Sequence, residues 1–129
     1  KLGYDLVIVD KKREKANESQ VMNIIGDVKG KDVILVDDMV DTAGTLVKAA
    51  EVLKQKGANS VMACCTHGVL SGPAYDRVAN GVLDELVISD TIPTKKDAKK
   101  ITVLTASTII GEAIRRIHNN ESVNSIFNN

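Results

Sequence analysis

The 129-residue chain is poor in aromatic side chains, with no Trp, one Phe and two Tyr. Proteins that hold single-stranded nucleic acid stack its bases on aromatic side chains, so this composition argues against such binding. Charge points the same way, because 17 basic residues balance 17 acidic ones and leave no bulk attraction for nucleic acid or for an anionic membrane. We therefore expect neither partner.

Long apolar runs are also missing. No stretch approaches the roughly 20 apolar residues that span a bilayer, and no signal-peptide pattern opens the sequence. The two cysteines, Cys64 and Cys65, are adjacent in an apolar stretch, where they cannot form an ordinary bridge to distant sequence, and no further metal ligands lie at suitable spacing. We expect them to pack in the core of a reduced, cytoplasmic protein.

The chain does contain an alternation of short β-branched runs with helical periods. Strands are expected at residues 6–9, 33–36, 61–65, 86–88 and 101–104, with an extra strand at residues 21–25 beside the first. Helices are expected at residues 45–56, 73–80 and 107–118, the last with Ile110, Ile114 and Ile117 facing inward. The strands lack a polar face, which predicts burial on both faces and mostly parallel pairing. This pattern predicts one α/β domain over residues 1–129, with a doubly wound sheet.

The most informative segment follows residues 33–36. That strand is expected to end at Asp37 and Asp38, at the carboxyl edge of the sheet, where open α/β folds bind ligands. The next turn opens a helix, whose N-terminal N–H groups favour a phosphate. Its residues are Asp41, Thr42, Ala43, Gly44 and Thr45. Gly44 would let the backbone approach an anion, while the two acids suit sugar hydroxyls or a phosphate-bound Mg²⁺. The segment predicts a site for a phosphorylated sugar.

Residues 36–45 resemble the phosphoribosyl-pyrophosphate (PRPP) binding motif shared by ribose-phosphate pyrophosphokinases and type I phosphoribosyltransferases. Three other segments, residues 10–13, 63–74 and 89–93, are similar to the pyrophosphokinases alone. The resemblance covers essentially the whole chain and implies a type I phosphoribosyltransferase-like fold. It also implies a two-domain enzyme, of which this chain is the C-terminal phosphoribosyl-binding domain. The adenine pocket and the main Mg²⁺ site would then lie in sequence before Lys1.

The resemblance implies that the diphosphoryl group of Mg-ATP is transferred to the 1-hydroxyl of ribose 5-phosphate, giving PRPP and AMP for nucleotide biosynthesis. Lys11 and Arg13 match the family's catalytic pair, with Mg²⁺ as cofactor. The implied substrate-binding residues are Arg13, Asp37, Asp38, Asp41, Thr42, Ala43, Gly44 and Thr45. The chain itself is assigned no metal site, because His67 and His118 lie in no cluster of acids.

The C-terminal segment resembles the family's tail, where a serine-containing turn contributes to a regulatory site for ADP and phosphate. Ser122, Val123 and Asn124 would belong to this site, with Asn124 in place of a usual Ser. The alternative is a frayed polar terminus. By the same resemblance we expect a homo-oligomer, specifically a hexamer.

Two other functions would use the same loop. A type I phosphoribosyltransferase would need a base-binding hood and a pyrophosphate-binding element upstream, and residues 10–13 and 63–74 argue against it. A non-catalytic regulatory subunit or binding module would keep the fold but lose Lys11, Arg13 or the phosphate loop. All three are present, so a pyrophosphokinase is the main expectation.

Overall fold

The computed structural model describes residues 5–12, 21–95 and 97–127. In chain order the elements are β1 (Ile8–Lys12), β2 (Val21–Ile25), β3 (Asp32–Val40), α1 (Gly44–Gln55), β4 (Ser60–Gly68), α2 (Ala74–Asn80), β5 (Glu85–Ser89), β6 (Ile101–Leu104), α3 (Ser107–His118) and the 3₁₀ turn η1 (Asn124–Ile126). None of the described helices is long and apolar enough to cross a membrane.

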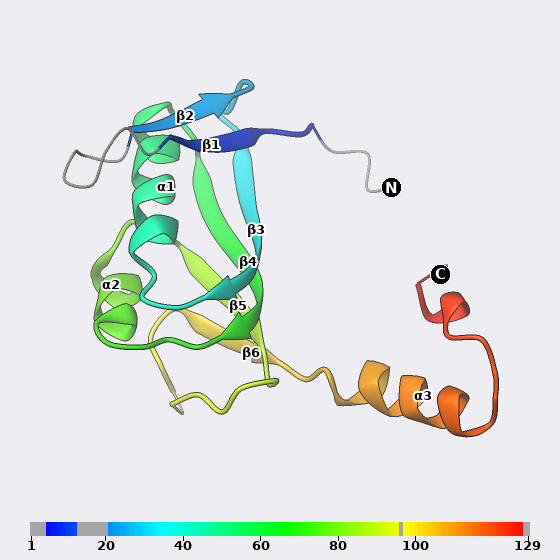
Figure 1. The fold of residues 1–129 in the computed structure, drawn as a ribbon. Helices are drawn as coiled ribbons and strands as arrows, with labels where there is room; N and C mark the ends of the chain where they lie inside the picture. The colour runs from blue at the N-terminus through cyan, green and yellow to red at the C-terminus, as the bar shows by residue number, and fades with distance from the viewer. Residues whose placement is uncertain (1–4, 13–20, 96, 128–129) are drawn as a thin grey trace.

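The main sheet has four parallel strands in the order β3-β4-β5-β6, and α1 and α2 lie against the same face of it (Figure 1). Strands β1 and β2 form a separate antiparallel pair. The predicted α/β fold with a parallel sheet is confirmed, as is a strand at residues 21–25 beside the first. Residues 6–9 were expected in the main sheet; instead β1 begins at Ile8 and pairs only with β2.

The core lies between the sheet and its two helices. Leu53 of α1, Val61 and Ala63 of β4, and Leu86 and Ile88 of β5 are each at most 1% exposed. Alternate strand residues point to one face of a sheet, so these positions meet the apolar stripe of α1. This packing fixes the start of α1 above the carboxyl ends of β3 and β4.

The predicted end of the strand at residue 36 is wrong. β3 continues through Asp37 and Asp38 to Val40, because Val36, Asp37, Met39 and Val40 are paired in register with the second half of β4. Both acids therefore lie inside a strand. The pairing partner lies about 28 residues away along the chain, so the local sequence pattern does not reveal the extension.

The expected burial on both faces is not observed within the described residues. On the face opposite α1, Val36 is 82% exposed and Ile34 is 60% exposed. The last helix, α3, extends away from the sheet (Figure 1), and Ile110, Ile114 and Ile117 are exposed instead of facing inward. An apolar face in the sequence predicts that the face is buried, but it does not identify the polypeptide that packs against it.

Candidate functional site

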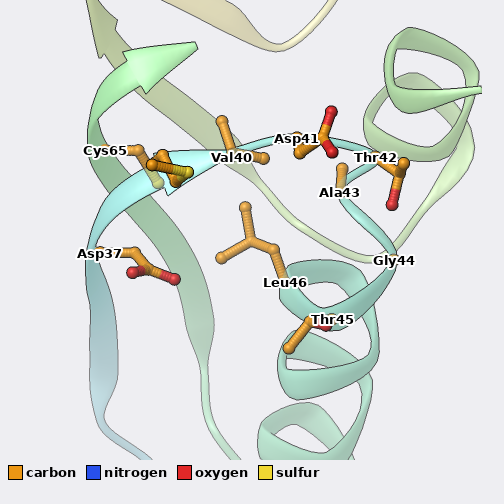
Figure 2. A pocket seen from close by; sticks show the side chains of 10 residues that line it. Asp37, Val40, Asp41, Thr42, Ala43, Gly44, Thr45, Leu46 and Cys65 are labelled. Carbon is orange, nitrogen blue, oxygen red and sulfur yellow. The ribbon is translucent and has the colours of Figure 1, made fainter. Parts of the chain in front are cut away.

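A cavity of about 230 Å³ opens where β3 ends and α1 begins (Figure 2). Asp37 reaches it from β3, Cys65 from β4, and Leu46 from the first turn of α1. Residues 41–45, which connect β3 to α1, form the remaining wall together with Met39 and Val40. The cavity therefore lies at the carboxyl edge of the parallel sheet, where open α/β folds bind ligands.

Most of the predicted sugar-phosphate residues line this cavity, but Asp38 does not. The residues that do are Asp37, Asp41, Thr42, Ala43, Gly44 and Thr45. Consecutive strand residues point to opposite faces of a sheet. Because Asp37 and Asp38 lie inside β3 rather than after it, only Asp37 faces the cavity, and the two acids do not act as a pair.

Each of the two acids uses one carboxylate oxygen within the strand. Asp37 Oδ1 accepts a hydrogen bond from the Asp38 backbone N–H (2.9 Å), and Asp38 Oδ1 accepts one from the Met39 N–H (2.7 Å). An ionised carboxylate has a second oxygen and further lone pairs to offer. Asp37 can therefore accept a hydrogen bond from a sugar hydroxyl in the cavity while its other oxygen fixes its orientation.

The connection to α1 has an unusual backbone. Ala43, the residue before the helix, is in the left-handed conformation (φ 58°) and buried, and its carbonyl accepts the Val47 N–H (3.0 Å). No side chain caps the start of α1 and no acid lies in its first turn. The positive end of the helix dipole therefore faces the cavity without a protein carboxylate from that turn, which favours an anion.

Residues 69–77, which follow β4, donate hydrogen bonds to the connection between β3 and α1. The N–H groups of Val69 and Leu70 both donate to the Val40 carbonyl, at 3.0 and 3.1 Å, and the Ser71 N–H donates to the Asp41 carbonyl at 3.1 Å. Ser71 Oγ also donates a short hydrogen bond to the Asp41 carboxylate. Arg77 of α2 donates from Nη1 to the Thr42 carbonyl at 2.9 Å.

Ser71 and Arg77 were not identified from the sequence. They follow the connection by about 30 residues, and only the parallel pairing of β3 with β4 brings them to it. Ser71 lies within residues 63–74, which were noted for their similarity to the pyrophosphokinases and for no local chemistry. Arg77 lies in a short helix with no motif around it.

Cys65 lines the cavity from β4. Burial, then the nearby Asp37 carboxylate, raises the pKa of its thiol to about 11. It therefore stays protonated near neutral pH, which is the less reactive form of a thiol. Both cysteines are free; Cys65 is buried in the core as predicted, whereas Cys64 is only partly buried.

The remaining predicted site residues lie away from the cavity or outside the described residues. The backbone of Lys11 pairs with Met22 near the end of β1; its side chain, and the whole of Arg13, lie outside what the structure describes. At the C-terminus, Arg116 Nη1 donates to the Ser122 carbonyl (3.0 Å), and Ser122 Oγ accepts the Asn124 N–H (3.3 Å). The predicted regulatory residues, with Val123 between them, thus form a turn tied to α3.

Metal-ligand clusters are not found among the described residues: no three His, Cys, Asp or Glu side chains come together in a way that could hold an ion. His67 lies on β4 with Nδ1 2.9 Å from the Thr91 hydroxyl.

Comparison with known proteins identifies the family to which the chain belongs. Residues 7–128 match the model of the phosphoribosyl synthetase-associated domain family. The chain is 70% identical over 126 residues to a ribose-phosphate pyrophosphokinase from Campylobacter jejuni subsp. jejuni, covering 98% of this chain and 41% of the relative. It is 64% identical over 127 residues to one from Helicobacter hepaticus, with the same shares.

Among solved structures, the crystal structure of phosphoribosylpyrophosphate synthetase from Mycobacterium smegmatis superposes with a TM-score of 0.81 at 36% identity, covering 92% of this chain and 38% of that one. The chain thus spans about two fifths of the length of the curated relatives it matches. Because the family model covers nearly every residue, including β3, the connection and α1, this chain belongs to the phosphoribosyl synthetase-associated domain family.

Proposed function

We propose that the full-length protein carrying this chain is a ribose-phosphate pyrophosphokinase, acting in nucleotide biosynthesis. The observation that carries the proposal is one cavity that joins the uncapped start of α1 to the Asp37 carboxylate, which suits a sugar bearing a phosphate. Relatives that bear this name and share most of the chain's residues support the reaction. The chain would be the C-terminal phosphoribosyl-binding domain of a two-domain enzyme.

Ribose 5-phosphate would bind with its phosphate on residues 41–45 and its ring toward β3. Backbone N–H groups at the start of α1 and the Thr42 and Thr45 hydroxyls are donors suited to phosphate oxygens. Asp37 would accept hydrogen bonds from the ribose hydroxyls and so fix the anomeric end. Asp38, on the other face, would act only by holding the backbone at Met39.

In the reaction, the 1-hydroxyl oxygen of the sugar forms a bond to the β-phosphorus of ATP. The bond from that phosphorus to the oxygen bridging to the α-phosphorus breaks, AMP leaves with the electron pair, and the hydroxyl proton passes to solvent. Such transfers depend mainly on positioning and on neutralising charge. Lys11 and Arg13 would stabilise negative charge on the moving group as they close over the triphosphate.

Mg²⁺ is part of this proposal as a cation carried by the substrate. Such an ion needs one or two carboxylates in addition to phosphate oxygens, and it keeps several waters. Asp37 offers a hard oxygen donor in the cavity and suits that role, whereas a site made only of protein ligands has no counterpart among the described residues. When bound, Mg²⁺ would neutralise charge on the triphosphate.

Assembly and regulation are proposed from the family alone. We propose a cytoplasmic homohexamer, in which ADP or phosphate acts as an effector at the turn formed by Ser122, Val123 and Asn124. The hydrogen bond from Arg116 to the Ser122 carbonyl would connect the conformation of this turn to α3.

A product assay tests the proposed function. The full-length protein, given ATP, ribose 5-phosphate and Mg²⁺, should form AMP and PRPP. Pyrophosphate released from PRPP and a nucleobase would instead indicate a phosphoribosyltransferase, and neither product would indicate a regulatory subunit. Residues 1–129 alone should form no AMP, because the adenine pocket is proposed to lie elsewhere in the full-length protein.

A further inference from the structure

Arg77 contacts the proposed phosphate loop from a different helix. Its Nη1 donates a 2.9 Å hydrogen bond to the Thr42 carbonyl, although the guanidinium is otherwise exposed on α2. A hydrogen bond from a charged donor is stronger than one between neutral groups. A trans peptide points its C=O and N–H in opposite directions, so this bond turns the Ala43 N–H to the other side of the loop.

The same guanidinium lies against Gly44. A β-carbon placed on Gly44 would be 3.1 Å from Arg77 Nη1 and 3.7 Å from its Cζ. Gly44 is not among the residues with a positive φ, so its backbone conformation does not require glycine. The absence of a side chain at this position therefore leaves space for the guanidinium beside the first residue of α1.

Arg77 acts together with the segment before it. Val40, Asp41 and Thr42 each have their carbonyl held by a donor from residues 69–77. Ser71 also engages the Asp41 carboxylate. In Figure 2 the Asp41 carboxylate points away from Thr45. These bonds orient the acid and the carbonyl groups, all of which would repel a phosphate if they faced it.

Arg77 places a positive charge beside the N-terminus of α1. A guanidinium beside a helix N-terminus adds to the positive end of the dipole, which is unfavourable unless an anion is present. The first turn of α1 supplies no acid. This combination is suited to a protein that binds an anionic group at the loop.

From these contacts we propose, on the basis of the proposed function, that Arg77 is a positioning residue of the ribose 5-phosphate site. It holds the Thr42–Ala43 peptide in the orientation that receives the 5-phosphate and keeps positive charge beside it. Arg77 acts through the Thr42 carbonyl and lies outside the sequence motif that marks the loop.

Calorimetric titration of the full-length protein with ribose 5-phosphate and, separately, with ATP tests this role. Arg77→Met, which keeps much of the side-chain length but removes donor and charge, should weaken ribose 5-phosphate binding by about tenfold or more, as expected for loss of a charged hydrogen bond. ATP affinity should change by less than about twofold. Arg77→Lys keeps the charge without the planar fork and should recover part of the loss. Asp76→Asn, on the same exposed surface of α2, is the control and should bind both ligands as the wild type does.

Three results would overturn the role of Arg77. One is wild-type ribose 5-phosphate affinity in Arg77→Met; another is equal weakening of sugar-phosphate and ATP binding, which would indicate a general loss of structure. If Arg77→Met does not fold, a folded Arg77→Gln variant, which removes the charge and shortens the side chain, decides the question, and unchanged affinity there is the third. A wild-type protein that binds no ribose 5-phosphate and forms no AMP would overturn the proposed function as well, whereas an active wild type with an unaffected Arg77→Met would overturn only this inference.

Discussion

At the start of α1, Ala43 and Gly44 have different backbone requirements. Ala43 takes the left-handed conformation at φ 58°, which costs a non-glycine residue about 1 kcal/mol or more. Gly44 has an ordinary conformation but lies against Arg77. The sequence suggested that Gly44 serves close approach of the backbone to an anion; the structure adds the guanidinium as a second neighbour of the same position.

Gly44→Val tests the space at this position. A branched side chain would displace the Arg77 guanidinium and crowd the loop, so ribose 5-phosphate affinity in the full-length protein should fall at least tenfold (about 1.4 kcal/mol). Gly111→Ala is the matched control, because a β-carbon there meets nothing within 4 Å and alanine favours a helix. Calorimetry gives the affinities. Unchanged binding in a folded Gly44→Val variant would mean that the phosphate lies elsewhere.

The catalytic pair gives a second residue-scale prediction. Lys11→Ala and Arg13→Ala should each lower kcat by roughly a hundredfold or more and leave KM within a few-fold, because their interactions strengthen mainly in the transition state. Steady-state AMP formation by the full-length protein separates the two parameters. A large rise in KM at constant kcat would instead assign these residues to ground-state binding.

At the scale of elements, Asp84 ties the end of α1 to the start of β4. Its Oδ2 accepts the Val61 N–H at 2.7 Å and pairs with Lys54 at 2.9 Å. The hydrogen bond from Val61, then that from Lys54, lowers the pKa of this carboxyl below its ordinary value of 3.8. The ion pair is substantially exposed and contributes little by itself, so the bond to the backbone of buried Val61 is the larger effect.

Asp84→Ala should therefore lower the free energy of unfolding by about 1 to 3 kcal/mol, the cost of leaving a buried N–H without a partner. Asp84→Asn keeps an acceptor and should lose less. Because the folded pKa is depressed, the carboxylate's contribution is present above pH 3.8 and is lost as pH falls through the lower folded value. Urea unfolding and hydrogen exchange of the Val61 amide measure the effect.

Glu51→Ala, at an exposed position on α1, is the control for that experiment. It should unfold at nearly the wild-type urea concentration. If Asp84→Ala behaved in the same way, or if its deficit did not shrink at all as the pH was lowered below 3.8, the Asp84 carboxylate would not be what connects the two elements.

For the molecule as a whole, one face of the β3-β4-β5-β6 sheet has no covering layer among the described residues, as Figure 1 shows. Parallel sheets are almost always covered on both faces. The chain spans only 41% of the length of its relatives. We propose that further polypeptide of the full-length protein packs on this face, where Val36 and Ile34 are exposed.

Residues 1–129 produced alone should accordingly self-associate as concentration rises, because the exposed apolar face can be buried between copies. Val36→Lys should reduce this association, whereas Val82→Lys, which replaces a valine 42% exposed after α2, should not. Sedimentation velocity over a range of concentrations checks both. A chain that stayed monomeric throughout would show that this face needs no cover.

Local sequence was sufficient to predict the helices and strands whose own residues show the apolar period and the turn residues typical of them. β6 and α3 have the predicted bounds, α2 begins one residue later than predicted, and α1 begins and ends one residue earlier. The loop at residues 41–45 was recognised from its residue types. Such features depend on neighbours within a few positions along the chain: apolar period, helix start and turn chemistry. The parallel sheet was predictable for the same reason.

Only the tertiary structure decided the rest. The pairing of β3 with β4 extended the strand through Asp37 and Asp38 and so turned one acid toward the cavity and the other away. That pairing also brought Ser71 and Arg77 to the loop. Likewise, the sequence showed that α3 and the sheet have apolar faces, but it did not show that these faces are exposed in the described residues. Each of these outcomes depends on contacts between residues far apart in the chain, which periodicity and local motifs do not encode.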